Sequence, residues 1–181
     1  MENYKVIFTV EGRRNALKRL GKKYGLPTKN DGDLSEIRSH YMAEKVLHLI
    51  DPDLNIIHNP EKSRIDLTFQ SGKTIGAEIK FREIPHNTFP TAYLSPEKAE
   101  ELFKRGDWLV YPYDDGYFYI WDCSKYQPPR NKHFTKRYEH TYDFGNGKGK
   151  YVLEQGYDFD FSKAIYRGSI AKGKEFFKHN D

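Results

Sequence analysis

The fold is decided by the stretch RIDLTFQSGKTIGAEIKF, which covers residues 64–81. Apolar residues alternate with polar or small ones on both sides of Ser71-Gly72-Lys73, and this pattern is typical of a β-hairpin with one buried face. An odd-length turn keeps the apolar residues of both arms on one face and pairs Leu67 with Ala77. The same register places Asp66 directly opposite Glu78.

Two facing carboxylates need a positive charge between them, because like charges across neighbouring strands are destabilising. At about 5 Å they repel by roughly 3 kcal/mol at an effective dielectric of 20. Mg²⁺ or Mn²⁺ meets this need, since such an ion is held by one or two carboxylates together with water and phosphate. Lys80 lies on the same face and could bind phosphate or steady a metal-bound water. The alternative is a solvated face on which Asp66, Glu78 and Lys80 neutralise one another.

The composition favours a folded intracellular protein. The 181 residues are 37% hydrophobic and 31% charged, and they include 14 Tyr and 12 Phe, which argues against disorder. No apolar run reaches membrane-spanning length and the first residues lack a secretory signal, so we expect a cytoplasmic protein, with association with the nucleoid an option. The single cysteine, Cys123, excludes an internal disulfide and a multi-cysteine zinc site. A net charge of +4 fits a polyanionic partner.

We divide the chain into an N-terminal segment (1–32), a core (33–123) and a C-terminal extension (124–181). Residues 4–10 read as a strand and residues 12–24 as a helix. One face of this helix is basic and could neutralise phosphates, although a solvated charged face is an equal alternative. Its candidate nucleic-acid contacts are Arg14, Lys18 and Lys22.

A second helix is predicted over residues 33–50. Asp33 and Glu36 have the spacing of a capping box. Glu44 lies at the edge of the apolar stripe and can lean towards whatever the helix packs on, and Glu36 is its rival for that role. The alternative for Glu44 is an ordinary exposed carboxylate.

The remaining core elements follow from turn and cap signals. Pro85 and Pro90 predict a loop over residues 82–94, and Ser95-Pro96 begins a helix that Gly106 ends. Strands are predicted over residues 54–58, 108–112 and 117–121.

The extension interleaves cations with aromatic residues between residues 125 and 142, which is expected where rings stack on bases and cations follow a backbone. An arm packed on its own domain and a dimerisation element are the alternatives. The cations proposed to contact nucleic acid are Lys132, Lys136 and Arg137.

The order αβββαβ, with an acid in the first helix, then Asp66, then Glu78-Ile79-Lys80, resembles the PD-(D/E)XK nuclease superfamily. The resemblance covers roughly residues 33–122, although Ile65 stands where many members carry Pro. It implies an α/β, restriction-endonuclease-like fold in which helices flank a mixed central sheet.

The resemblance also implies a chemistry, that of a Mg²⁺- or Mn²⁺-dependent DNA endonuclease, with a homodimer as an option. Asp66 and Glu78 would ligate the metal with the Ile79 carbonyl, and Glu44 would help directly or through water. Lys80 would position the attacking water. Arg82 follows the motif and is a candidate DNA contact.

Two other functions compete with this one. The first is a non-catalytic nucleic-acid-binding module on the same fold, which has no use for two repelling carboxylates. The second is an RNA-directed nuclease. A zinc or HNH-type nuclease is disfavoured, because the seven histidines are dispersed and no partner cysteines exist.

Overall fold

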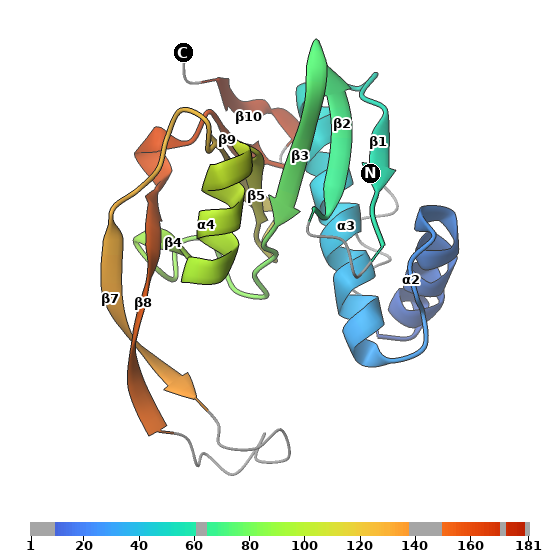
Figure 1. Ribbon diagram of the computed structural model, residues 1–181. Coiled ribbons are helices and arrows are strands. Elements are labelled where there is room, and N and C mark those ends of the chain that lie inside the picture. The colour runs from blue at the N-terminus through green and yellow to red at the C-terminus, as the bar shows by residue number, and fades with distance from the viewer. Residues whose placement is uncertain (1–9, 61–64, 138–149, 171–172, 180–181) are drawn as a thin grey trace.

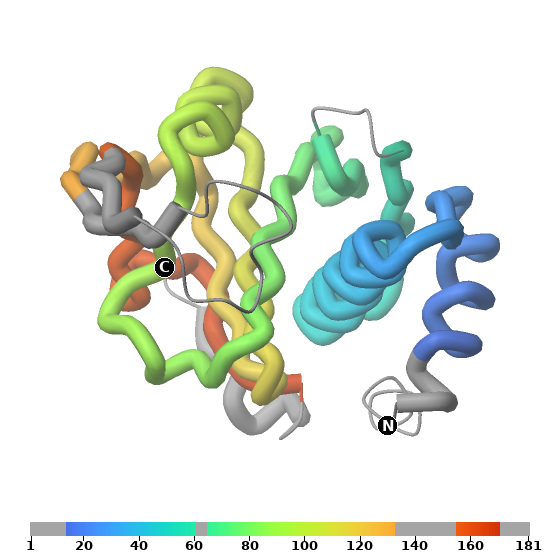
Figure 2. The backbone as a smooth tube through the Cα atoms, turned by 90° about the horizontal axis from the view of Figure 1, so that it is seen from below, coloured from blue at the N-terminus to red at the C-terminus, as the bar shows by residue number. Residues whose placement is uncertain are grey.

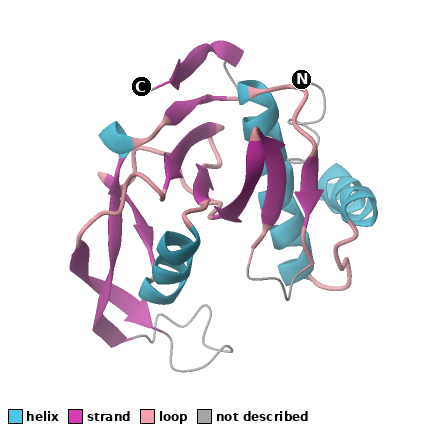
Figure 3. Cartoon of the chain, turned by 45° about the horizontal axis from the view of Figure 1, so that its top comes forward, coloured by secondary structure: helices cyan, strands magenta, loops and turns pink. Residues whose placement is uncertain are grey.

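The computed structural model describes residues 10–60, 65–137, 150–170 and 173–179. It is a mixed α/β protein in which these residues form three α-helices and two sheets (Figure 1; Figure 3). The strand predicted over residues 4–10 lies outside the described residues, apart from Val10, which begins the first helix. The helices are α2 (Val10–Tyr24), α3 (Asp31–Ile50) and α4 (Pro96–Arg105).

The larger sheet has seven strands in the order β1-β2-β3-β5-β6-β9-β10. Strands β3 and β5 run parallel and the other pairs are antiparallel, so the predicted mixed sheet is confirmed. Its strands are β1 (Ile56–His58), β2 (Leu67–Ser71), β3 (Lys73–Ile79), β5 (Trp108–Pro112), β6 (Tyr117–Asp122), β9 (Tyr166–Ser169) and β10 (Gly173–His179).

A smaller sheet has the order β4-β8-β7. It consists of β4 (Thr91–Leu94), β7 (Arg130–Arg137) and β8 (Lys150–Asp160), and β7 and β8 form a long twisted ribbon (Figure 1). The loop predicted over residues 82–94 is therefore wrong at its end, because Thr91–Leu94 pairs with β8. The segment interpreted as an extension supplies strands to both sheets.

The hairpin has the predicted register. Leu67 pairs with Ala77 and Ser71 with Lys73, across Gly72 at a φ of 71°. Glycine suits this left-handed conformation because it has no Cβ. The pairing ends at Leu67 and Ala77, and the next residues beyond this pair are Asp66, just before β2, and Glu78, in β3.

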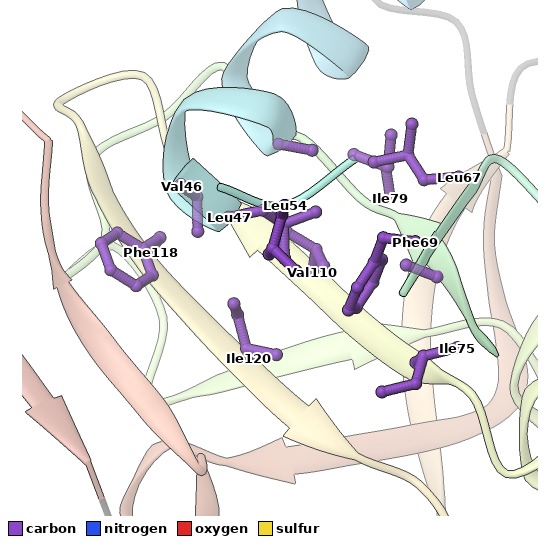
Figure 4. Packing of buried hydrophobic residues seen from close by; sticks show 12 residues of the cluster. Val46, Leu47, Leu54, Leu67, Phe69, Ile75, Ile79, Val110, Phe118 and Ile120 are labelled. Carbon is purple, nitrogen blue, oxygen red and sulfur yellow. The ribbon is translucent and has the colours of Figure 1, made fainter. Parts of the chain in front are cut away.

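Both faces of the larger sheet are covered. On one face α3 packs through Val46 and Leu47 against Phe69, Val110 and Ile120 (Figure 4). On the other face α4 and the smaller sheet cover the alternate residues of β5 and β6, which include Leu109, Tyr111 and Trp121.

The same alternation orients β3. Its apolar residues Ile75, Ala77 and Ile79 belong to the core under α3. Because side chains alternate along a strand, Glu78 lies on the opposite face. That face is the one that α4 covers.

Helix α3 begins two residues before the prediction. Asn30 caps it, with its side chain accepting from the Asp33 amide while the Asp33 carboxylate accepts from Asn30. The capping box is thus Asn30 with Asp33, not Asp33 with Glu36, and Glu36 lies in the second turn. No helix among the described residues is long and apolar enough to cross a membrane.

Candidate functional site

An acidic pocket of about 810 Å³ lies between α3, the ends of β2 and β3, and α4. Figure 2 shows β3 running between the two helices. Five carboxylates and two permanent cations line the pocket, and this excess of negative charge attracts cations and repels phosphate. The charged residues are Glu36, Asp66, Glu78, Glu97 and Glu101, with Lys98 and Arg105.

Asp66 is fixed against the neighbouring strand. Its Oδ2 accepts a hydrogen bond of 2.7 Å from the backbone amide of Ile79, and its carbonyl accepts one of 2.9 Å from the amide of Asn59. The carboxylate is therefore held at the end of β3 beside Glu78. Ile79 also lines the pocket.

Glu78 is the most buried of these acids, with 5% of its surface exposed. Burial raises the pKa of Glu78, and the negative charge of Asp66 raises it further. The ammonium of Lys98, in the first turn of α4, forms an ion pair with Glu78 and opposes this rise. The positive charge expected beside the two acids is thus supplied, in part, by the chain itself.

Lys80 lies at the border of the acidic pocket rather than within its lining. Its side chain lines a second pocket, although Glu78 and Asp66 remain close enough to favour its charged form. Burial lowers the pKa of Lys80, and the positive charges of Arg82 and Lys98 lower it further.

Glu44 does not line the acidic pocket. Its Oε1 lies 3.1 Å from the Nζ of Lys23 and its Oε2 lies 3.4 Å from the Nε2 of His58. Burial by itself would raise the pKa of Glu44, but hydrogen bonds from His58, Tyr24 and Lys23 lower it to about 2. The expected place of Glu44 beside a metal is therefore not observed.

Glu36, the rival acid, does line the pocket. Residues 36, 40 and 44 follow one another at helical spacing, and two histidines separate Glu44 from the pocket. The Nε2 of His40 lies 3.9 Å from the Oε1 of Glu36, and its Nδ1 lies 3.0 Å from the Nδ1 of His58. Glu44 lies one turn further along α3 and instead contacts the ammonium of Lys23 and the hydroxyl of Tyr24, at the end of α2.

The predicted nucleic-acid contacts are dispersed. Arg82 is held in the wall of the second pocket, where its Nε donates to the Oη of Tyr111 at 2.7 Å. Lys18 and Lys22 are exposed on α2, as is Arg14, which lies 3.6 Å from Asp31. On β7, Lys132 is exposed, whereas the side chains of Lys136 and Arg137 lie outside the described part of the chain.

The sequence did not predict that Arg105 lines the pocket and is held there by Asp107. Arg105, which lines the pocket, donates from its Nε to the Oδ2 of Asp107 at 2.5 Å, and the Oδ1 of Asp107 accepts from the Gly76 amide at 3.2 Å. A Cβ at Gly76 would lie 2.7 Å from that carboxylate. Glycine inside a strand marks such a close approach, and it is the one signal in the sequence that pointed here.

The donor set suits a hard cation. Among the residues that the structure describes, no group of three or more His, Cys, Asp or Glu side chains is arranged to hold a metal ion. The two carboxylates of Asp66 and Glu78 remain, and Mg²⁺ is commonly bound by one or two carboxylates while water fills its other positions. The ammonium of Lys98 pairs with one of these two carboxylates, that of Glu78.

Comparisons with known proteins add no relative. The chain matches no protein-family model, and neither the curated proteins nor the solved structures include a match. Its function is therefore inferred from the geometry and charge of the acidic pocket.

Proposed function

We propose that the protein is a metal-dependent deoxyribonuclease, of the endonuclease type, with a restriction-endonuclease-like core of the PD-(D/E)XK kind. The observation that carries the proposal is that Asp66 and Glu78, at the end of the β2–β3 hairpin, line one acidic pocket with Lys80 at its border. The element order α3-β1-β2-β3-α4-β5 agrees with the αβββαβ order of that core, with β4 added before α4.

In this proposal Asp66, Glu78 and the Ile79 carbonyl would hold Mg²⁺ or Mn²⁺. Such an ion polarises a phosphoryl oxygen and lowers the pKa of a bound water. Glu36 takes the place that Glu44 was expected to have, because Glu36 is the α3 carboxylate that lines the pocket.

The chain's own residues have distinct tasks. The amide of Ile79 orients the Asp66 carboxylate. The ammonium of Lys80 would position the attacking water and offset negative charge that develops on the phosphate. Lys98 neutralises Glu78 when no other cation is near.

The charge of the pocket also bears on how DNA would bind. Its five carboxylates repel a phosphodiester until a cation neutralises them. Affinity for DNA must then come from surfaces outside the pocket, for which exposed Lys18, Lys22 and Lys132 are available.

The test is a cleavage panel with the purified full chain. Supercoiled plasmid, linear duplex, single-stranded DNA, a four-way junction and RNA are each incubated with Mg²⁺, Mn²⁺ or EDTA. We expect cleavage of DNA with either metal and none with EDTA. Nicking of a closed circular substrate separates endonuclease from exonuclease action, and the RNA substrate tests the RNA-directed alternative.

Matched variants locate the activity. We expect Asp66→Asn, Glu78→Gln and Lys80→Ala each to lower the rate by at least about 100-fold, as general acid–base and electrostatic groups do. The controls are Asp53→Asn and Lys104→Ala, which change exposed side chains outside the pocket lining. Full activity in the first three variants would remove the site, and salt-sensitive DNA binding without cleavage in any metal would favour the binding module.

A further inference from the structure

A second pocket, of about 660 Å³, adjoins the acidic one. Ile79 lines the acidic pocket and Lys80, the next residue, lines the second. At the start of α4, Glu97 lines the first and Ser95 the second. The two pockets therefore meet at the end of β3 and the start of α4.

The lining of this second pocket combines three kinds of group. Aromatic rings come from Phe89, Tyr93, Tyr111 and Tyr113, cations from Lys80 and Arg82, and a carboxylate from Asp158. Rings stack on bases and cations pair with phosphate, and a carboxylate accepts hydrogen bonds from an exocyclic amine of a base. The volume is in the range, roughly 300–1,000 Å³, of pockets that bind small molecules.

Hydrogen bonds hold the wall of the pocket in place. The Oη of Tyr111 accepts from the Nε of Arg82 at 2.7 Å and donates to the carbonyl of Tyr93 at 3.1 Å. The carboxylate of Asp158 accepts from the Oγ1 of Thr91 and the Nδ2 of Asn131. A ligand would thus meet a preformed surface, which lowers the entropy lost on binding.

The ring of Tyr93 packs directly against Gly156 of β8. A Cβ at Gly156 would lie 2.1 Å from that ring, so no residue with a side chain fits there without moving it. The position of the Tyr93 ring can therefore be altered from outside the pocket lining, through Gly156.

Phe89 is the exposed aromatic ring of the lining. It lies between β3 and β4, next to Pro90, with 61% of its surface exposed. Among the described residues, the large hydrophobic side chains exposed to this degree are Phe89 and Ile57, at 54%. An apolar ring at the mouth of a pocket can enter a base stack in place of a base, as the wedge residues of DNA-bending proteins do.

We propose that the second pocket takes one unstacked nucleotide of the substrate, next to the phosphate at the acidic pocket, while Phe89 fills the gap left in the stack. This inference rests on the proposed nuclease function and specifies its substrate. Extruding a base costs least where it is unpaired or mismatched. Bulged, mismatched and single-stranded DNA are therefore the substrates that fit best.

The first experiment measures free mononucleotides. The full chain is titrated calorimetrically with dAMP, dCMP, dGMP and dTMP, and separately with inorganic phosphate. We expect at least one mononucleotide to bind at least tenfold more tightly than phosphate. Because the Phe89 ring also lines this pocket, it can stack on a free nucleotide when no duplex is present. Its loss in Phe89→Ala should then weaken that binding by about tenfold, whereas Ile57→Ala, the matched exposed residue, should leave it unchanged.

A second variant changes Gly156, which does not itself line the second pocket, and so tests whether the position of the Tyr93 ring matters for binding. Gly156→Ala is expected to weaken mononucleotide binding to a similar degree, because the added methyl group displaces the Tyr93 ring. Thermal unfolding shows whether this variant remains folded, and Phe89→Ala, at an exposed position, carries the test if it does not. Phosphate that binds as tightly as the nucleotides, or equal nucleotide binding by Phe89→Ala and the unchanged protein, would overturn the inference.

The second experiment compares DNA duplexes that differ in one bulged nucleotide. Fluorescence anisotropy in Ca²⁺, a hard cation that carboxylates bind and that would neutralise the acidic pocket, gives the affinity for the bulged and the perfect duplex. We expect the bulged duplex to bind about tenfold more tightly than the perfect duplex. This ratio of affinities should approach one in Phe89→Ala but not in Ile57→Ala.

Failure of the nucleotide-pocket inference can be distinguished from failure of the proposed nuclease function. Metal-dependent cleavage without nucleotide binding or bulge preference removes only the inference. Nucleotide binding without cleavage in any metal removes only the nuclease.

Discussion

Lys98 places its ammonium against the carboxylate of Glu78 and so joins the first turn of α4 to β3. Glu78 is buried, whereas the side chain of Lys98 is about half exposed. A divalent cation held by Asp66 and Glu78 would compete with Lys98 for the same carboxylate. The pair therefore gives Glu78 a positive partner when no metal is present, and it would weaken the binding of a metal to this carboxylate.

Removing this competitor should strengthen metal binding. We expect Lys98→Gln to raise the affinity for Mn²⁺ by about tenfold or more, since a unit charge about 4 Å away contributes up to roughly 4 kcal/mol at an effective dielectric of 20. Electron paramagnetic resonance of free Mn²⁺ measures the affinity. Lys104→Gln, an exposed lysine of the same helix, is the control, and an unchanged affinity in Lys98→Gln would show that metal does not bind at Glu78.

Glu44 should contribute to stability in a pH-dependent way. Burial by itself would raise the pKa of Glu44, but hydrogen bonds from His58, Tyr24 and Lys23 lower it from 4.5 to about 2. Because the folded pKa lies below the unfolded one, the stabilisation is present above pH 4.5 and is lost as the pH falls towards 2. At pH 7 the shift corresponds to about 3 kcal/mol.

The measurement is urea unfolding of Glu44→Gln and the unchanged protein at pH 7 and pH 3. We expect Glu44→Gln to lower the free energy of unfolding by about 2–3 kcal/mol at pH 7 and by clearly less at pH 3. Glu100→Gln changes an exposed carboxylate of α4 and serves as the control. A difference that stays constant with pH contradicts the assigned cause.

Local patterns in the sequence were enough to predict the hairpin. The alternation around Gly72 determines which residues face the core, and a shift by one residue would expose Leu67 and Phe69. The end of α4 at Gly106, whose φ is 65°, and the hairpin of β5 and β6 follow from equally local signals. Asp66 and Glu78 could be placed together for this reason.

Features that depend on distant contacts could not be predicted. Strand β4 exists because Ala92 pairs with Phe159, more than sixty residues away. Helical spacing puts Glu36 and Glu44 on one side of α3, and only the packing of α2 turns Glu44 towards Lys23. The pairing of Lys98 with Glu78 likewise requires knowing how α4 lies on the sheet.

Gly76 should tolerate no side chain. Its added Cβ would lie 2.7 Å from the carboxylate of Asp107, which accepts from the Gly76 amide and from Arg105. We expect Gly76→Ala to lower the free energy of unfolding by about 1–3 kcal/mol, as overpacking does. Chemical denaturation measures it, and Thr74→Ala, at an exposed position of the same strand, should change stability by less than about 0.5 kcal/mol. Equal effects of the two substitutions would show that Asp107 does not occupy this place.

The basic face of α2 should determine part of the salt dependence of DNA binding. Lys18 and Lys22 are both exposed and lie one turn apart on α2, so a single DNA backbone could contact both. Each phosphate neutralised contributes about 0.9 to the slope of log K against log salt concentration. We expect the double variant Lys18→Gln, Lys22→Gln to bind duplex DNA more weakly and to lower that slope by about 1.8.

Anisotropy titrations in EDTA between 50 and 200 mM NaCl measure the slope. The double variant Lys125→Gln, Lys163→Gln removes the same charge from exposed positions elsewhere and should leave the slope nearly unchanged. If both double variants lower the slope equally, the effect comes from net charge alone and α2 is not a contact surface.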